Sequence, residues 1–152
     1  MKICDLTQSY TATSGGVRTY IDEKRKYIEC HTSSEHVLII PGEKDSVSRT
    51  GRLAVHTVAS PFIPGCEPYR LALRLGHVVS ILKDEMPDIV ELGCAYTLPW
   101  AAFRHRKDHP CAVIGFYHTD FPYAYVEKTV NDIFGRSEER RVGKECRSWW
   151  VP

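Results

Sequence analysis

The sequence lacks the features that mark secreted, disulfide-bonded or membrane-spanning proteins. Its six cysteines are widely spaced and include no Cys-x-x-Cys pair, which favours reduced, mostly buried thiols over a disulfide framework or a zinc site. No apolar run approaches the ~20 residues of a membrane span, and the first ten residues have neither the basic start nor the long apolar run of a secretion signal. We therefore expect a cytoplasmic protein.

The chain also lacks a strong excess of charge of either sign and any internal repeat. Its formal net charge of +1 argues against a broad nucleic-acid-binding surface. A hydrophobic content of 43% and a charged content of 26% are typical of a soluble globular protein. At 152 residues, the chain is long enough for one domain with a sizeable core.

The last residues differ in character from the rest of the chain. Residues 136–148 closely resemble the conceptual translation of a common short-read sequencing adapter, and the match ends at Trp149. The tail holds five of the 20 basic and three of the 19 acidic residues, so residues 1–135 carry a net charge of −1. We expect residues 136–152 to be an artefactual tail, the natural protein to continue beyond Gly135, and only residues 1–135 to belong to the domain. A basic C-terminal helix is the alternative.

The pattern of apolar residues predicts an α/β domain with a Rossmann-like, doubly wound parallel sheet. Short apolar runs predict strands at 1–4, 35–42, 53–58, 88–92 and 111–117. Apolar residues at helical spacing predict helices over 17–28, 69–86, 98–107 and 125–134. Residues 5–13, 43–51 and 62–68 are expected to form loops or irregular segments, because they are polar or rich in proline and glycine.

Two adjacent glycines, Gly15 and Gly16, stand where the first predicted strand turns into the first helix. Paired glycines let backbone N–H groups approach a ligand closely, and the first turn of a helix directs unpaired donors at an anion. A tight connection without a ligand has the same pattern. In a doubly wound sheet, ligands collect at the carboxyl ends of the strands, where the strand order reverses. The loops at 14–18, 91–96 and 118–120 are therefore the candidate site.

These three loops carry a resemblance to a known family. The motifs are Ser-Gly-Gly-Val-Arg-Thr-Tyr at 14–20, Pro-Asp-Ile-Val-Glu at 87–91 and Gly-Phe-Tyr-His-Thr-Asp-Phe-Pro at 115–122. In this order and spacing, the sequence resembles the N-terminal domain of family-four glycosyltransferases, which are retaining enzymes of the GT-B architecture. The similarity extends from Lys2 to about Tyr125. The stretch 36–44 is also similar to a bacterial subgroup described as glycosyltransferases or mannosyltransferases.

The resemblance implies transfer of a hexose, such as mannose or glucose, from a nucleotide-diphosphate sugar to a glycan, lipid or small-molecule acceptor. No metal or other cofactor is expected. A histidine after the fifth strand lies near the transferred sugar in such enzymes, so the expected catalytic residue is His118, which would stabilise an oxocarbenium-like sugar. Contacts with the donor phosphates and sugar are expected at Gly15, Gly16, Val17 and Arg18. Acceptor contacts are expected at Glu91, Tyr96 and Asp120.

Each of these assignments has a structural alternative. Glu91 and Tyr96 can serve only to hold the end of a strand and its loop, Arg18 can belong to a solvated helix face, and His118 can be hydrogen-bonded within its loop. In the family, the paired glutamates and the basic phosphate-binding residues belong to a C-terminal domain that this sequence does not contain. We expect that domain, from the same natural protein, to be a partner of this one. We therefore expect this chain to be inactive by itself.

Three other functions fit parts of the sequence. A zinc hydrolase would use His105, His109, Cys111 and His118, and a nicotinamide-binding module would share the fold but lacks the third spaced glycine. A non-catalytic nucleotide- or ligand-binding Rossmann-like domain is the third. The basic run 104–107 can form a solvated helix end, or it can touch anionic lipid or an acidic glycan. Peripheral contact with the inner face of the membrane is therefore an additional expectation. We expect no transmembrane segment and no nucleic acid as a partner.

Overall fold

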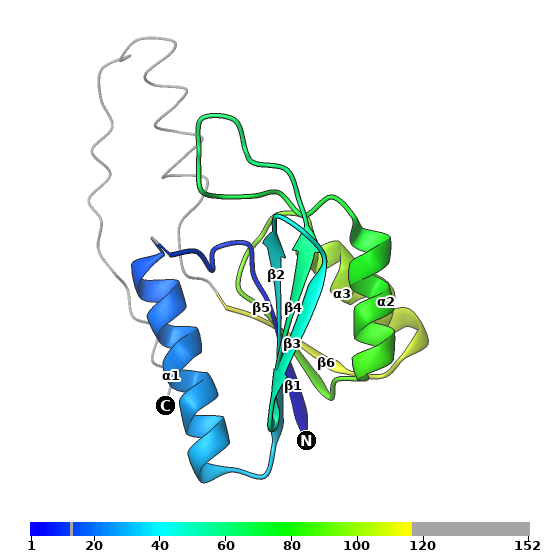
Figure 1. Ribbon diagram of the computed structural model, residues 1–152. Coiled ribbons are helices and arrows are strands. Elements are labelled where there is room, and N and C mark those ends of the chain that lie inside the picture. Colours follow the sequence, from blue (N-terminus) through cyan, green and yellow to red (C-terminus); the bar gives the residue numbers. More distant parts are fainter. Residues whose placement is uncertain (13, 117–152) are drawn as a thin grey trace, which may run out of the picture. The chain divides into compact units, whose positions relative to one another are not determined.

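A computed structural model describes residues 1–12 and 14–116 of the chain (Figure 1). In chain order the elements are β1 (Lys2–Leu6), α1 (Gly15–His31), β2 (Glu35–Gly42), β3 (Ser46–Thr50), β4 (Leu53–Ala59), α2 (Leu75–Glu85), β5 (Ile89–Leu92), α3 (Leu98–Asp108) and β6 (Ala112–Gly115). The helix expected at 125–134 and the domain boundary expected after residue 135 lie outside the described residues.

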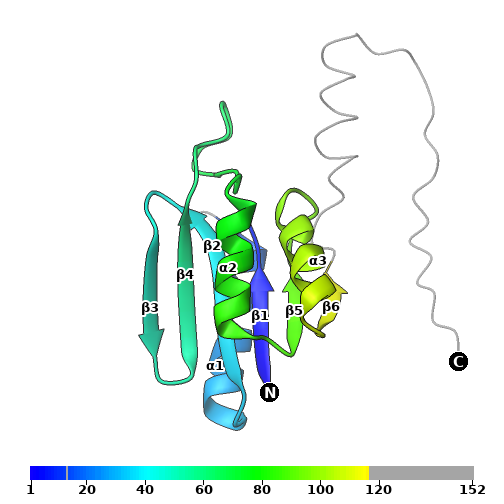
Figure 2. The same cartoon turned by 90° about the vertical axis from the view of Figure 1, so that its right-hand side faces the viewer.

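The six described strands form one sheet in the order β3-β4-β2-β1-β5-β6. All neighbouring strands are parallel except the β3–β4 pair, which is antiparallel. Helix α1 covers one face of this sheet, and α2 and α3 cover the other (Figures 1 and 2). The predicted α/β, Rossmann-like fold with a doubly wound sheet is confirmed.

The main core lies between the sheet and the α2–α3 layer. It is built from alternate residues of the central strands and from the inward stripes of the two helices, including Leu6, Val37, Val90, Leu82 and Ala102, all at most 1% exposed. Burying an aliphatic side chain of this kind stabilises the fold by about 1.5–3 kcal/mol. The strand 35–42, predicted to be buried on both faces, has four consecutive buried residues from His36 to Ile39.

The expected loop at 43–51 is wrong in part, because β3 lies within it. Strand β3 pairs with β4 through a tight hairpin that includes Gly51, a glycine with a φ of +55°. All five residues of β3 are exposed, since the strand lies at the edge of the sheet. The strand therefore has no buried side to produce an alternating pattern.

The second predicted helix begins six residues too early. Residues 69–74 pair with the proline-rich segment before them instead: Leu71 N–H donates to Pro61 O (3.0 Å), and Ile63 N–H donates to Tyr69 O (3.0 Å). The guanidinium of Arg70 lies 3.7 Å from the centroid of the Phe62 ring. These local contacts delay α2 until Leu75.

The first strand is longer than expected, and the cysteines are less buried. Strand β1 continues through Asp5 and Leu6, which were assigned to a loop, because a cation and a histidine compensate the buried charge of Asp5. The five described cysteines are free thiols, but only Cys4 is buried. Cys30 and Cys66 are exposed, so the expectation of mostly buried thiols is wrong.

Candidate functional site

The strand order reverses between β1 and β5, at the centre of the sheet. From β1 the chain moves through α1 to β2 on one side, and from β4 it crosses through α2 to β5 on the other. Strands β1 and β5 pair in parallel, with Leu6 opposite Leu92. Their carboxyl ends therefore lie side by side, and the loops that follow them form the switch point at which α/β sheets bind ligands.

The start of α1, which follows β1, has an open backbone surface. A Cβ atom added at Gly15 or Gly16 would meet no other atom within 4 Å. The hydroxyl of Ser14 lies 2.8 Å from Thr11 Oγ1 and does not cap the helix, and the first turn contains no acidic residue. Within the described residues, no group accepts a hydrogen bond from the backbone N–H of Gly15 or Gly16. These donors and the positive end of the helix dipole can therefore bind an anion.

Val17 and Arg18 complete the first turn of α1. Val17 is half-buried and Arg18 is exposed. The Nε atom of Arg18 lies 3.5 Å from Asp22 Oδ2, and the hydroxyl of Tyr10 donates to Asp22 Oδ1 (2.6 Å). The Arg18 guanidinium also lies 5.7 Å from the centroid of the Tyr10 ring. Arg18 is thus held beside the helix start by neighbours on the surface.

The loops after β1 and β5 are in close contact. Gly93 N–H donates to Leu6 O (2.9 Å), and a Cβ atom at Gly93 would lie 3.1 Å from the Cβ atom of Thr7. The half-buried Tyr96 belongs to the same loop after β5. This close contact favours a glycine at 93, because a larger residue would crowd the side chain of Thr7.

Gln8 links the two loops and keeps one acceptor unused. The Thr97 hydroxyl donates its proton to Ala72 O (2.6 Å), so in the 2.7 Å contact between Thr97 Oγ1 and Gln8 Nε2 the amide must be the donor. The orientation of the Gln8 amide is thereby fixed. Its Oε1 atom is buried and has no hydrogen-bond partner in the described part of the chain, so it can accept a hydrogen bond from water or a ligand hydroxyl.

A buried cluster of charged groups lies between α1 and the sheet, next to the switch point. Lys24 Nζ lies 2.7 Å from Asp5 Oδ1 and 3.0 Å from Glu91 Oε1. The hydroxyl of Tyr20 also donates to Glu91 Oε1 (3.0 Å). Burial raises the pKa of Asp5. The hydrogen bond from His36 and the charge of Lys24 lower this pKa by more than burial raises it, so the net pKa lies below its ordinary value. Glu91, predicted to bind the acceptor, is thus also part of this cluster.

The geometry around His36 fixes its tautomer. A guanidinium has only donors, so in the 2.9 Å contact between Arg25 Nη1 and His36 Nδ1 the ring nitrogen must accept. The proton therefore resides on Nε2, which donates to Asp5 Oδ2 (3.0 Å). The His36 side chain is completely buried. It links Asp5 of β1 to Arg25 of α1 through these two hydrogen bonds.

The last described residue brings the end of β6 next to α1. Phe116 stacks on the Tyr20 ring, with centroids 4.9 Å apart. Two of the predicted site residues, His118 and Asp120, lie outside the described residues. The structure places the glycine turn after β1 and Glu91 and Tyr96 at the end of the neighbouring strand β5, where Glu91 contacts Tyr20 of α1. Sequence reasoning did not identify Gln8, Thr97 or the cluster around Asp5.

Other expectations concern metals and membranes. Among residues 1–12 and 14–116, no three His, Cys, Asp or Glu side chains are grouped as metal ligands. His105 and His109, named for a zinc site, stack with ring centroids 4.9 Å apart, and His118 lies outside this part of the chain. No helix within these same residues combines the length and apolar character needed to cross a membrane.

Comparison of the sequence with protein-family models finds no matching family, and comparison with curated proteins finds no match.

Proposed function

We propose that this chain is part of the acceptor-side, N-terminal domain of a retaining glycosyltransferase of the GT-B architecture. The glycine turn of α1 would approach the diphosphate and hexose of a nucleotide sugar, and the loop after β5 would contact the acceptor. The observation that carries the proposal is the open, uncapped start of α1 at the β1–β5 switch point. The resemblance of the three loop motifs supports the same function.

The electrostatics of the turn suit a diphosphate. With no carboxylate in the first turn, the helix dipole is not neutralised locally, and it stabilises an anion at this end by about 0.3–1 kcal/mol. Each charge-assisted hydrogen bond from a backbone N–H adds to this term. Arg18 lies in the same turn, although Asp22 offsets part of its charge.

The neighbouring groups suit a sugar. Gln8 Oε1 can accept a hydrogen bond from a hydroxyl, and the carboxylate of Glu91 has a second oxygen with no partner among the described residues. Retaining transfer passes through an electron-poor sugar, so hydrogen bonds aimed at its hydroxyls keep it in place. His118 is proposed to supply one of them and Asp120 to contact the acceptor.

The test compares two glycines that occupy similar positions in different helices. Gly16 and Gly76 both lie in the first turn of a helix, and a Cβ atom at either would meet nothing within 4 Å. Both replacements by alanine should therefore preserve the fold. In an NMR titration with nucleotide-diphosphate glucose or mannose, we expect Gly16→Ala to raise the Kd about tenfold, because the added methyl group keeps the diphosphate from approaching the backbone N–H groups and one charge-assisted hydrogen bond is lost. We expect Gly76→Ala to leave the Kd unchanged.

Two results would contradict the proposal. If neither nucleotide sugar binds, or if Gly16→Ala binds as tightly as the unchanged chain, the glycine turn is not the donor site. Binding that is insensitive to Gly16 would favour the alternative, a ligand-binding Rossmann-like domain with its site elsewhere. We further expect the 152-residue chain to transfer no sugar by itself, so observed transfer would refute the need for the C-terminal domain.

A further inference from the structure

The outer face of α3 carries two large aromatic side chains. Trp100 is 68% exposed and Phe103 is 47% exposed, whereas the buried residues of this helix are Leu98, Ala101, Ala102 and His105. A helix of a soluble domain normally places its aromatic residues inward. Two large apolar rings on the solvent side of one helix turn are typical of an interaction surface.

The same face is rich in cations. Arg104, Arg106 and Lys107 are exposed, and none of them pairs with an acidic group in the described part of the chain. The acidic residue of this helix, Asp108, lies 3.5 Å from Lys83 of α2. The aromatic side chains of α3 therefore lie beside cations that have no ion-pair partner among the described residues.

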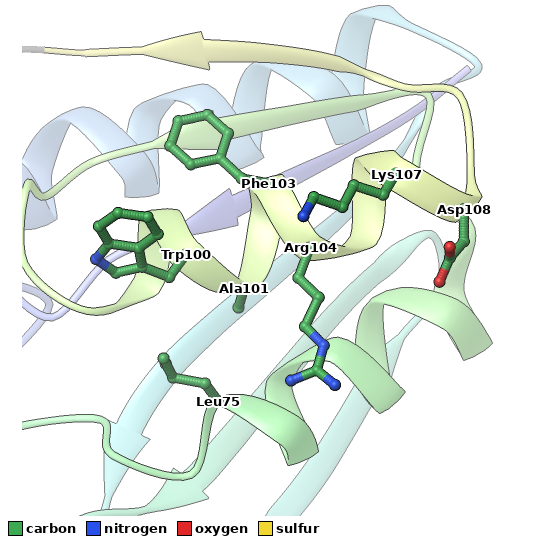
Figure 3. A pocket seen from close by; sticks show the side chains of 7 residues that line it. All are labelled: Leu75, Trp100, Ala101, Phe103, Arg104, Lys107 and Asp108. Carbon is green, nitrogen blue, oxygen red and sulfur yellow. The ribbon is translucent and has the colours of Figure 1, made fainter.

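The aromatic and cationic side chains form one stripe. Trp100, Phe103, Arg104 and Lys107 follow the i, i+3, i+4, i+7 spacing of a single helix face. Figure 3 shows these side chains projecting from α3, with Leu75 of α2 facing them. Together with Ala101 and Asp108 they line a groove of about 480 Å³. We call Trp100, Phe103, Arg104 and Lys107 the α3 stripe.

We propose that the α3 stripe docks on the surface of an anionic lipid bilayer. Tryptophan and phenylalanine rings insert at the boundary between headgroups and acyl chains, and the cations beside them contact lipid phosphates. An acidic polymer would need an extended basic track, but α3 has 11 residues, a length of about 16 Å. The combination of rings, a groove and cations on one short helix fits a bilayer better. This inference does not depend on the proposed sugar transfer.

The test measures partitioning of the full chain onto vesicles by sedimentation. Vesicles of phosphatidylcholine with about 30% phosphatidylglycerol are compared with phosphatidylcholine alone. We expect binding to the anionic vesicles that is largely lost at roughly 0.5 M NaCl, since salt screens the lipid phosphates. Arg104→Gln/Lys107→Gln should weaken partitioning roughly 25-fold, at about fivefold for each charge. Trp100→Ala/Phe103→Ala should weaken it roughly tenfold or more.

Matched variants on other elements separate this surface from general effects. Lys26→Gln/Lys44→Gln removes the same charge from exposed positions outside α3, and Tyr27→Ala removes an aromatic side chain that is 60% exposed on α1. Both should partition like the unchanged chain. Circular dichroism checks that all variants keep their fold.

Several outcomes would overturn the proposal. The first is that the chain does not bind anionic vesicles, or that it binds them equally well at high salt. Alternatively, the α3 variants bind as tightly as the unchanged chain, which would place the contact elsewhere, for example in the basic residues after position 135. A chain that binds heparin but not vesicles would indicate an acidic polymer as the partner instead.

Discussion

Lys24 joins two carboxylates on neighbouring central strands, so its replacement by methionine tests the buried cluster beneath α1. Its Nζ atom lies 2.7 Å from Asp5 and 3.0 Å from Glu91, and Asp5 and Glu91 are register partners of β1 and β5. Methionine has a similar length but no charge. The variant would leave two carboxylates side by side without a cation between them.

The expected loss of stability follows from burial. Removing one partner of a buried ion pair costs about 3–5 kcal/mol. Asp5 is 3% exposed, but it keeps its hydrogen bond from His36, and Glu91 is 16% exposed and can be partly hydrated. We therefore expect Lys24→Met to lower the free energy of unfolding by about 3 kcal/mol at pH 7, a large part of the 5–15 kcal/mol typical of a domain.

The pH dependence of this loss has a definite sign. In the unchanged protein the pKa of Asp5 is lowered, although burial opposes this, because His36 and Lys24 favour the carboxylate. Its contribution to stability is present above the unfolded pKa of about 3.9 and is lost as the pH falls through the folded value. Without Lys24, the pKa of Asp5 in the folded state rises relative to the unchanged protein, because burial and the His36 hydrogen bond remain while the lowering effect of Lys24 is lost. The extra loss of stability in the variant is therefore present at neutral pH and is relieved as the pH falls through the pKa that Asp5 has in the variant.

The assay is urea unfolding at pH 7 and pH 4.5, with Lys26→Met as the control. Lys26 is exposed on the same helix and has no partner within the described residues, so its variant should differ by at most about 0.5 kcal/mol. The reasoning would be refuted if Lys24→Met lost no more stability than the control at pH 7. A loss that grew toward pH 4.5 would refute it as well.

Three further predictions concern other parts of the fold. A methyl group in Gly42→Ala would overlap Thr57 Cγ2, so we expect a loss of about 1–3 kcal/mol in urea unfolding. Glu85→Gln should lower the free energy of unfolding by about 2 kcal/mol at neutral pH. Burial raises the pKa of Glu85, but the hydrogen bonds from His56, Arg49 and Lys2 lower it by more, so its net pKa is lowered. The loss should therefore vanish as the pH falls through that lowered pKa. Nitrogen-15 NMR should find the proton of His36 on Nε2.

Each of these predictions has its own control or contrary result. Gly115→Ala places a methyl group where nothing lies within 4 Å, and it should be milder than Gly42→Ala. Asp84→Asn changes an exposed neighbour of Glu85. If Asp84→Asn and Glu85→Gln lost the same free energy of unfolding, the contacts of the buried Glu85 carboxylate would not stabilise the fold. A protonated Nδ1 in His36 would mean that Arg25 does not donate to the ring.

Most of the fold could be predicted because burial leaves a clear pattern in the sequence. The run from Val37 to Ile40 predicted a central strand, and Pro99 with a basic C-terminal turn predicted α3 closely. Strand β3 could not be predicted, because an exposed edge strand needs no apolar face. The start of α2 was missed since backbone pairing between Leu71 and Pro61 competes with the helical spacing of that segment.

The candidate site was predictable only where a local motif marks it. The pair Gly15–Gly16 is visible in the sequence, and its place at the switch point follows from the strand order. The contact of Lys24 with Asp5 and Glu91 joins three distant segments, so no spacing reveals it. Gln8 gave no signal either, because a glutamine in a loop is ordinary until its partner Thr97 is known.

The most direct test of the account is a map of amide chemical shifts on adding a nucleotide-diphosphate sugar to the isotope-labelled chain. The account predicts the largest changes at Gly15, Gly16 and Val17 and in the loop 93–97 after β5, with little change on the outer side of α2. The largest changes on elements away from the β1–β5 switch point, or no change at saturating ligand, would contradict it.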